Sequence, residues 1–255
     1  MDKTLRVTLV ANAGLLLEYN GTTLLVDGIY GKEGHPFSNL SHQVWQDLKN
    51  GQAPFDHVDF LLFTHAHPDH FSPEMTLEYL KCHPVKGVFA PRTSWVDGCG
   101  LTSFLNEQKI PCAWLSEETD RTGFRITPDI TVRAFRTRHL DKQFEKVRHF
   151  CYLITFGDKK ILLTGDLDYV NEDLSRLAGL RLAGAFVNPL FFAALCHGKF
   201  FRGNLETDHL LVYHIPFRED DKMGMLTTLD RNLARWGSER TPVTALREPF
   251  QQVCL

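Results

Sequence analysis

The chain has 255 residues, of which 43% are hydrophobic, and a formal net charge of -3. This composition suffices for a buried core, and the slight negative charge is not the basic field that is typical of nucleic-acid binding. No apolar run reaches the roughly 18 residues of a membrane span, and no signal-peptide core begins the chain. The six cysteines include no Cys-x-x-Cys pair, which suits a reducing compartment. We therefore expect a soluble cytoplasmic protein without a nucleic-acid or membrane partner.

The first predicted elements are strands. Apolar residues at 5–10 and 15–19 precede Asn20-Gly21, a strong signal for a type I′ hairpin turn, and residues 23–26 form the return strand. This strand stops at Asp27-Gly28. Residues 28–39 contain three glycines and one proline, which predicts a loop, and a helix is expected from about 39 to 49.

A cluster of polar residues follows the next apolar run, residues 58–63. Its sequence is Thr64-His65-Ala66-His67-Pro68-Asp69-His70. In an extended segment His65 and His67 project to one side, and Pro68 then redirects the chain so that Asp69 and His70 approach from another angle. Imidazole nitrogen and carboxylate oxygen are ligands that divalent transition metals accept together. The stretch therefore predicts a metal-binding turn.

Helices and strands alternate through the remainder of the chain. Ser72-Pro73 predicts an N-cap with proline in the first helical position, and Gly98 with Gly100 predicts a broken helix. The other expected elements are a helix to 82, strands at 85–90, 113–115, 130–137, 150–156, 160–163 and 210–213, and a helix over 220–236. No linker or repeat interrupts this pattern, so we expect a single domain over residues 1–255.

The His-x-His-x-Asp-His sequence at residues 65–70, directly after a buried strand, resembles the signature of the metallo-β-lactamase superfamily. The resemblance extends over most of the chain. It implies an α+β fold, the four-layered αββα metallo-β-lactamase sandwich, with a dinuclear metal site at one sheet edge. It implies a hydrolase more firmly than any one substrate.

The resemblance also assigns ligands residue by residue. It implies that one metal is bound by His65, His67 and His139 and the other by Asp69, His70 and His214, with Asp166 bridging and Asp27 supporting the site from beneath. When only the residues are considered, three of these ligand positions have a rival candidate. His149 competes with His139 but opens an apolar strand, Asp168 competes with Asp166, and His209 or His197 competes with His214.

The implied chemistry is hydrolysis by a water molecule that two divalent cations activate. Such a hydroxide would attack an ester, lactone, amide or phosphodiester bond of a small substrate, with Asp69 and Asp166 as catalytic carboxylates. Zinc is favoured by affinity, and iron or manganese also accept these ligands. An iron-dependent oxidoreductase of the thiol or persulfide dioxygenase type, and a catalytically silent metal-binding module, are the alternative functions.

Five further residues are candidates for substrate contacts. Tyr30 and His35 lie in the loop that follows Asp27, although a solvated loop is the simpler interpretation. Arg136 and Arg138 share one face of a strand by period two and could grip a phosphate or carboxylate, although a solvated strand face is the simpler interpretation. His197 is placed by the sequence in an irregular, glycine-containing segment.

Overall fold

The computed structural model describes residues 4–31, 35–116, 123–170, 173–198, 205–237 and 240–255. The chain divides into two compact units. Unit 1 comprises residues 1–116 and 248–254, and unit 2 comprises residues 117–247 and 255. Within the described ranges, no helix has the length and apolar character needed to cross a membrane.

Unit 1 is built on a seven-stranded sheet with the order β16-β1-β2-β3-β4-β5-β6. Its strands are β1 (Arg6–Ala11), β2 (Gly14–Tyr19), β3 (Thr22–Val26), β4 (Phe60–Leu62), β5 (Gly87–Pro91), β6 (Cys112–Leu115) and β16 (Gln252–Cys254). Asn20 and Gly21 have φ angles of 50° and 74°, which confirms the predicted hairpin turn. Strands β3 to β6 are parallel, so their carboxyl ends meet at one edge of the sheet.

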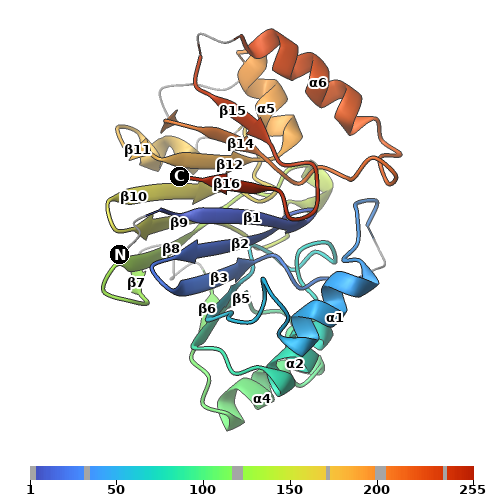
Figure 1. The fold of residues 1–255 in the computed structure, drawn as a ribbon, viewed down its shortest axis with the longest axis vertical. Helices are drawn as coiled ribbons and strands as arrows, with labels where there is room; N and C mark the ends of the chain where they lie inside the picture. Colours follow the sequence, from blue (N-terminus) through green and yellow to red (C-terminus); the bar gives the residue numbers. More distant parts are fainter. Residues whose placement is uncertain (1–3, 32–34, 117–122, 171–172, 199–204, 238–239) are drawn as a thin grey trace. The chain divides into compact units, whose positions relative to one another are not determined.

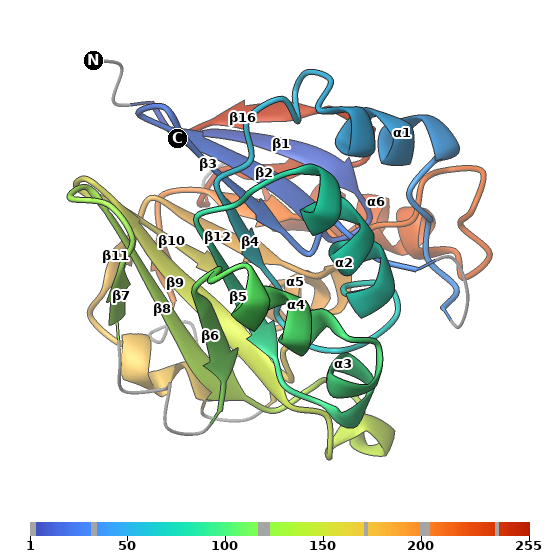
Figure 2. The same cartoon turned by 90° about the horizontal axis from the view of Figure 1, so that it is seen from below.

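The described residues of unit 1 form four α-helices, namely α1 (His42–Asn50), α2 (Pro73–Cys82), α3 (Ser94–Gly98) and α4 (Leu101–Glu107). Helix α2 begins and ends as predicted, with the Ser72 hydroxyl accepting the N–H of Met75 and Pro73 in the first turn. Figures 1 and 2 show α2 between α1 and α4, which it contacts on either side.

Unit 2 contains a second seven-stranded sheet with the order β15-β14-β12-β10-β9-β8-β7. Its strands are β7 (Gly123–Arg125), β8 (Ile130–Thr137), β9 (His149–Phe156), β10 (Lys159–Leu163), β12 (Gly184–Val187), β14 (Leu210–Val212) and β15 (Val243–Ala245). A small parallel pair joins β11 (Arg181–Leu182) and β13 (Glu206–Thr207). Strands β8, β10, β12 and β14 run in the same direction and end at one edge.

The helices of unit 2 are α5 (Pro189–Cys196) and α6 (Met225–Trp236), with single 3-10 turns η2 (Lys142–Phe144) and η3 (Asp173–Leu177). Figure 1 shows α5 and α6 side by side, and Leu195, Leu229 and Trp236 enter one buried cluster with residues of β12 and β14. Two large sheets and six α-helices within the described part of the chain confirm the predicted fold class.

One expectation about unit 2 is wrong. The last helix begins at Met225 and not near residue 220, because Gly224 adopts a left-handed conformation and the Asp221 carboxylate accepts the first two helical N–H groups. His197 lies in the turn that ends helix α5, next to Gly198, which agrees with the glycine-containing segment that the sequence predicted.

Candidate metal centre

In unit 1 the predicted metal-binding turn lies where strands β3 and β4 end. The N–H of Asp27 donates to the carbonyl of Leu62 at 2.9 Å, which places this aspartate beside the end of β4. The His67 carbonyl accepts the N–H groups of His70 and Phe71, both at 3.0 Å, so the turn is closed by its own backbone. Its polar side chains are therefore fixed at the carboxyl edge of the unit 1 sheet.

Asp27 organises this turn from beneath. It is 1% exposed, and its carboxylate accepts the Thr64 N–H at 2.8 Å, the Thr64 hydroxyl at 2.7 Å and the Nδ1 of His70 at 2.9 Å. Its backbone has a φ of 46°, an uncommon conformation for a residue with a side chain. Strained backbone of this kind clusters at functional sites, where neighbouring contacts hold it in place.

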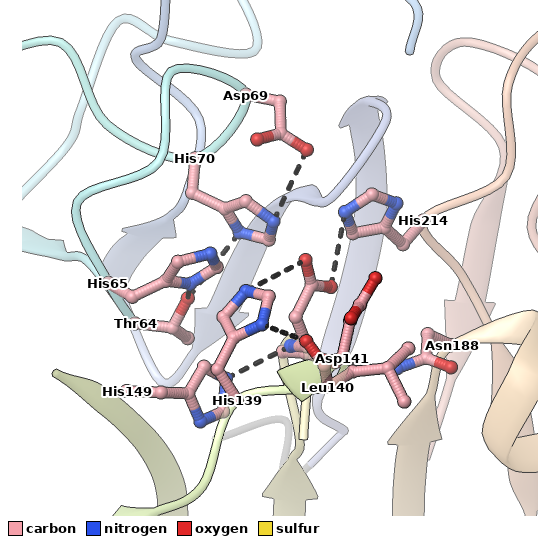
Figure 3. A network of polar contacts seen from close by, with 12 residues as sticks. Thr64, His65, Asp69, His70, His139, Leu140, Asp141, His149, Asn188 and His214 are labelled. Atoms are coloured by element: carbon pink, nitrogen blue, oxygen red, sulfur yellow. Dashed lines mark hydrogen bonds and ion pairs between the residues drawn. The ribbon is translucent and has the colours of Figure 1, made fainter. Parts of the chain in front are cut away.

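The hydrogen bonds of Asp27 determine which imidazole nitrogens are available to a metal. Because the single hydroxyl proton of Thr64 goes to Asp27, Thr64 accepts a hydrogen bond from the Nδ1 of His65 at 3.0 Å (Figure 3). His70 likewise uses Nδ1 as its donor to Asp27. Both rings therefore carry their lone pair on Nε2, which is the arrangement of metal-bound histidines oriented by a carboxylate.

The remaining donors of unit 1 lie close to these rings. The ring centre of His65 is 4.6 Å from that of His67 and 4.1 Å from that of His70. Asp69 is 4% exposed and its carboxylate lies 3.6 Å from the Nε2 of His70. Three imidazoles and one carboxylate therefore lie close together on this turn.

Asn12 is a neighbour of the turn that the sequence did not indicate. It lies between β1 and β2, is 0% exposed, has a φ of 46°, and donates from Nδ2 to the backbone carbonyl of Asp69 at 3.3 Å. Asparagine tolerates the left-handed region better than most residues. Asn12 therefore ties the metal-binding turn to the first hairpin of unit 1.

In unit 2 the predicted ligands follow three different strands. His139 follows β8, Asp166 follows β10 and His214 follows β14, and these three strands end at the same edge of the unit 2 sheet. Ligands at the carboxyl ends of such strands converge although they are distant in sequence. The bridge between His139 and Leu167, with the Leu140 N–H donating to the backbone carbonyl of Asp166 at 2.7 Å, joins two of these ends.

Asp166 lies between the two histidines of unit 2. One carboxylate oxygen is 3.6 Å from the Nε2 of His139 and the other is 3.3 Å from the Nε2 of His214. The Nδ1 of His139 contacts the carbonyl of Leu140, so its lone pair also lies on Nε2 (Figure 3). A carboxylate with one oxygen toward each imidazole has the arrangement of a ligand shared by two cations.

Buried polar groups hold Asp166 in this position. The Nε2 of His149 accepts the Asp166 N–H at 3.0 Å, and its Nδ1 contacts the Thr137 hydroxyl at 2.7 Å, so both ring nitrogens are occupied within unit 2. The preceding Gly165 has a φ of 53°, and its N–H donates to the Tyr213 hydroxyl at 2.8 Å. His149 therefore supports Asp166 through its backbone N–H.

The nearest buried thiol is unsuited to metal binding at neutral pH. Cys151 lies beside Thr137 on β9, and burial raises the pKa of its thiol to about 12. A thiol with this pKa stays protonated, whereas metal ligation and nucleophilic attack need the thiolate. The donors of unit 2 are therefore nitrogen and oxygen.

The structure places the two loop candidates for substrate contact inside unit 1. The ring of Tyr30 is 0% exposed and its hydroxyl donates to the Ser38 carbonyl at 2.8 Å. His35 contacts the Gly31 carbonyl through Nε2 at 3.0 Å and accepts the Phe37 N–H at 3.3 Å. Both residues therefore hold their own loop together, and their contact with a substrate stays a prediction.

The three candidates in unit 2 occupy different environments. Arg136 is half-buried on β8, but that strand ends at Thr137, so the exposed Arg138 lies beyond it and donates its N–H to Asp173. His197 is exposed and lies 3.3 Å from a guanidinium nitrogen of Arg235. His209, the rival of His214, precedes β14 and so lies at the opposite end of that strand.

A family model described as the beta-lactamase superfamily domain matches residues 22–188, which is more than half of the chain. The match begins in unit 1 and continues into unit 2. A search of curated proteins found no match.

Solved structures share this fold at low sequence identity. CmlA, a diiron β-hydroxylase from Streptomyces venezuelae, has a TM-score of 0.63 and 16% identity, over 100% of this chain and 54% of its own. This chain thus spans about half the length of CmlA. A putative metal-dependent hydrolase from Parabacteroides distasonis has a TM-score of 0.63 and 15% identity, over 97% of this chain and 94% of its own. An isothiocyanate hydrolase from Delia radicum gut bacteria has a TM-score of 0.64 and 15% identity, over 97% and 98%.

Proposed function

The chain belongs to the metallo-β-lactamase superfamily, and on that premise we propose that it is a hydrolase in which the ligands of both units jointly bind two divalent metal ions. His65, His67 and His139 would hold one ion, Asp69, His70 and His214 the other, and Asp166 both. Zinc is the favoured metal. The family match covers six of these seven residues, from His65 to Asp166.

The observation that carries this proposal is the orientation of the donor atoms in each unit. His65 and His70 commit Nδ1 to the Thr64–Asp27 pair, and His139 commits Nδ1 to a backbone carbonyl. Each of these rings therefore carries its lone pair on Nε2, the atom through which it would ligate a cation. The donors are nitrogen and carboxylate oxygen, as zinc, iron and manganese require.

When bound, the cations would supply Lewis acidity and a water molecule with a pKa near neutrality. The residues of the chain supply position and proton transfer. Asp27 fixes the rings of His65 and His70, and His149 fixes the backbone of Asp166. Asp69 would keep one carboxylate oxygen for orienting the attacking water and for holding its proton.

The test combines elemental analysis with a pair of matched variants. Protein purified without added metal should contain about two equivalents of a transition metal and hydrolyse at least one substrate in a panel of esters, lactones, amides and phosphodiesters. Asp166→Asn should lose most of the metal and at least about a hundredfold in kcat/KM. Asp168→Asn, in the neighbouring carboxylate, should keep both.

Retention of both metals and of full activity by Asp166→Asn would contradict the ligand assignment. If the wild-type protein bound two metals but hydrolysed no bond in the panel, the proposed hydrolase activity would be contradicted. It would favour the catalytically silent metal-binding module instead.

An iron-dependent oxidoreductase is the second candidate, because the fold is shared with a diiron β-hydroxylase. Oxygen ligands and imidazoles also accept iron. Iron as the purified metal, together with oxygen uptake in the presence of a thiol, persulfide or hydroxylatable substrate, would select this function over hydrolysis.

A further inference from the structure

The backbone around Asp166 is held by buried side chains of unit 2. The Gly165 N–H donates to the hydroxyl of Tyr213 at 2.8 Å, and the Gly165 carbonyl accepts the Nδ2 of Asn188 at 3.2 Å. The Asp166 N–H donates to His149. Tyr213 is 1% exposed and Asn188 is 4% exposed. Both polar atoms of the peptide group that joins Gly165 to Asp166 are therefore fixed by side chains.

The two side chains that hold Gly165 come from the ends of neighbouring strands. Figure 1 shows β14, β12 and β10 in this order, and Tyr213 follows β14, Asn188 follows β12 and Gly165 follows β10. Tyr213 therefore reaches past an intervening strand, a span of roughly 10 Å at the usual strand spacing. Its ring packs edge-on against Phe186 of that strand, with 6.0 Å between the ring centres. This contact keeps the long side chain in one orientation.

Tyr213 also adjoins a second proposed ligand. It directly precedes His214, and its own N–H donates to the Val187 carbonyl at 3.1 Å. His214 has a φ of 59°, a left-handed conformation that a residue with a side chain keeps only when its surroundings hold it. The hydrogen bond between Gly165 and Tyr213 thus links the backbone segments that carry Asp166 and His214.

Asn188 has two separable contacts. Its Oδ1 accepts the N–H of Phe191 at 2.9 Å and so caps helix α5, while its Nδ2 holds the Gly165 carbonyl. An amide side chain can do both because it carries an acceptor and donors. Serine caps a helix about equally well but has no amide donor. Asn188→Ser therefore removes the contact with Gly165 and keeps the cap.

We infer that Tyr213 and Asn188 are positioning residues for Asp166. They direct its two carboxylate oxygens toward His139 and His214, and Tyr213 also holds His214 in place. The inference rests on the proposed function and deepens it. Without the Tyr213 hydroxyl, the ion bound by His214 loses the support of two ligands, whereas the ion bound by His139 loses the support of one. The two metal sites should therefore respond unequally.

The test titrates metal-free protein with Co²⁺, whose visible absorption reports binding. Tyr213→Phe keeps the ring, and we expect one equivalent of Co²⁺ to bind at least about tenfold more weakly while the other changes by less than about threefold. Asn188→Ser should weaken both equivalents by a similar factor, about three- to tenfold. Tyr79→Phe is the matched control, because Tyr79 in α2 is also 1% exposed, and both affinities should stay unchanged.

Thermal unfolding of the metal-free proteins separates positioning from general stability. A Tyr213→Phe variant with a lower melting temperature but wild-type Co²⁺ affinities would overturn the inference and leave the hydroxyl a structural role only. Equal weakening of both equivalents would overturn the link to His214. If Tyr213→Phe does not fold, Asn188→Ser decides, since unchanged affinities in that variant would overturn the positioning of Asp166.

Metal binding and hydrolysis are measured separately, so the inference and the proposed function can fail independently. Wild-type protein that shows the expected Co²⁺ pattern with its variants but cleaves no bond in the substrate panel would contradict the hydrolase and support the positioning roles. Hydrolysis with a single bound ion would overturn the inference and leave the hydrolase standing. Wild-type protein that binds no Co²⁺ would overturn both.

Discussion

The two units carry their candidate metal ligands in different ways. Unit 1 carries His65, His67, Asp69 and His70 on a single turn, in which Asp27 holds His70 directly and His65 through Thr64. Unit 2 supplies one side chain from each of three strand ends, and separate buried groups support them. A local cluster of ligands is thus encoded by adjacent residues, whereas a dispersed one is encoded by the order of strands in a sheet.

The largest expected effect comes from removing a ligand of the local cluster. His67→Ala should abolish metal retention and lower kcat/KM by at least about a hundredfold, while the fold stays intact because His67 is only partly buried. Elemental analysis and circular dichroism measure the two outcomes. His57→Ala, which replaces a largely exposed histidine in the same unit, is the control. Stoichiometric metal in His67→Ala would show that the turn is not the ligand cluster.

Replacing one supporting residue in each unit separates the contributions of the two units to metal affinity. Asp27→Asn disturbs two ligands at once, so we expect a loss of about 10- to 100-fold in metal affinity. His149→Gln disturbs only the backbone of Asp166, so its loss of affinity should be smaller. Competition with a chromophoric chelator measures both variants. A larger loss in His149→Gln would mean that unit 2 dominates metal binding.

Asn12→Asp should have a smaller effect. The variant keeps the size and left-handed tendency of the side chain but removes the Nδ2 donor to Asp69, a hydrogen bond worth about 1 kcal/mol. We expect metal affinity to fall by about three- to tenfold. Asn20→Asp, at the other left-handed asparagine of the same sheet, should leave metal affinity unchanged. Equal losses in the two variants would indicate a general effect of added charge.

The smallest predicted change is in how the stability of unit 2 depends on pH. Burial lowers the pKa of His209 below its ordinary value of 6.5, so the unfolded chain binds this proton more readily than the folded one. Its contribution to stability is therefore present above pH 6.5 and is lost as the pH falls through the lower, folded-state pKa. His209→Gln, which can still reach the Thr244 hydroxyl, should flatten the loss of thermal stability between pH 7 and pH 5. An unchanged pH profile would assign that loss to other groups.

The sequence predicted the local features of both units well and the dispersed ones less well. The Ser72-Pro73 signal located the start of α2, and Asn20-Gly21 located a hairpin. Helix α5 was missed because its sequence is apolar on all faces and has no amphipathic period, although Asn188-Pro189 offered the same capping signal.

Asn12 shows why some contacts lie beyond sequence reasoning. Its hydrogen bond reaches a residue 57 positions away, and its own neighbourhood resembles an ordinary turn. His139, Asp166 and His214 were assigned through the family resemblance, since no local pattern relates three separate strand ends. The structure places them together within unit 2 because β8, β10 and β14 share one direction.

Strand β16 has a consequence for synthesis of the protein on the ribosome. It pairs antiparallel with β1, near the beginning of the chain, yet it is translated only after residues 117–247. Until then the edge of β1 has unpaired N–H and C=O groups, the kind of edge that recruits other chains. A nascent chain stalled before residue 248 should therefore be prone to aggregate and dependent on chaperones, even with all of its metal ligands already made.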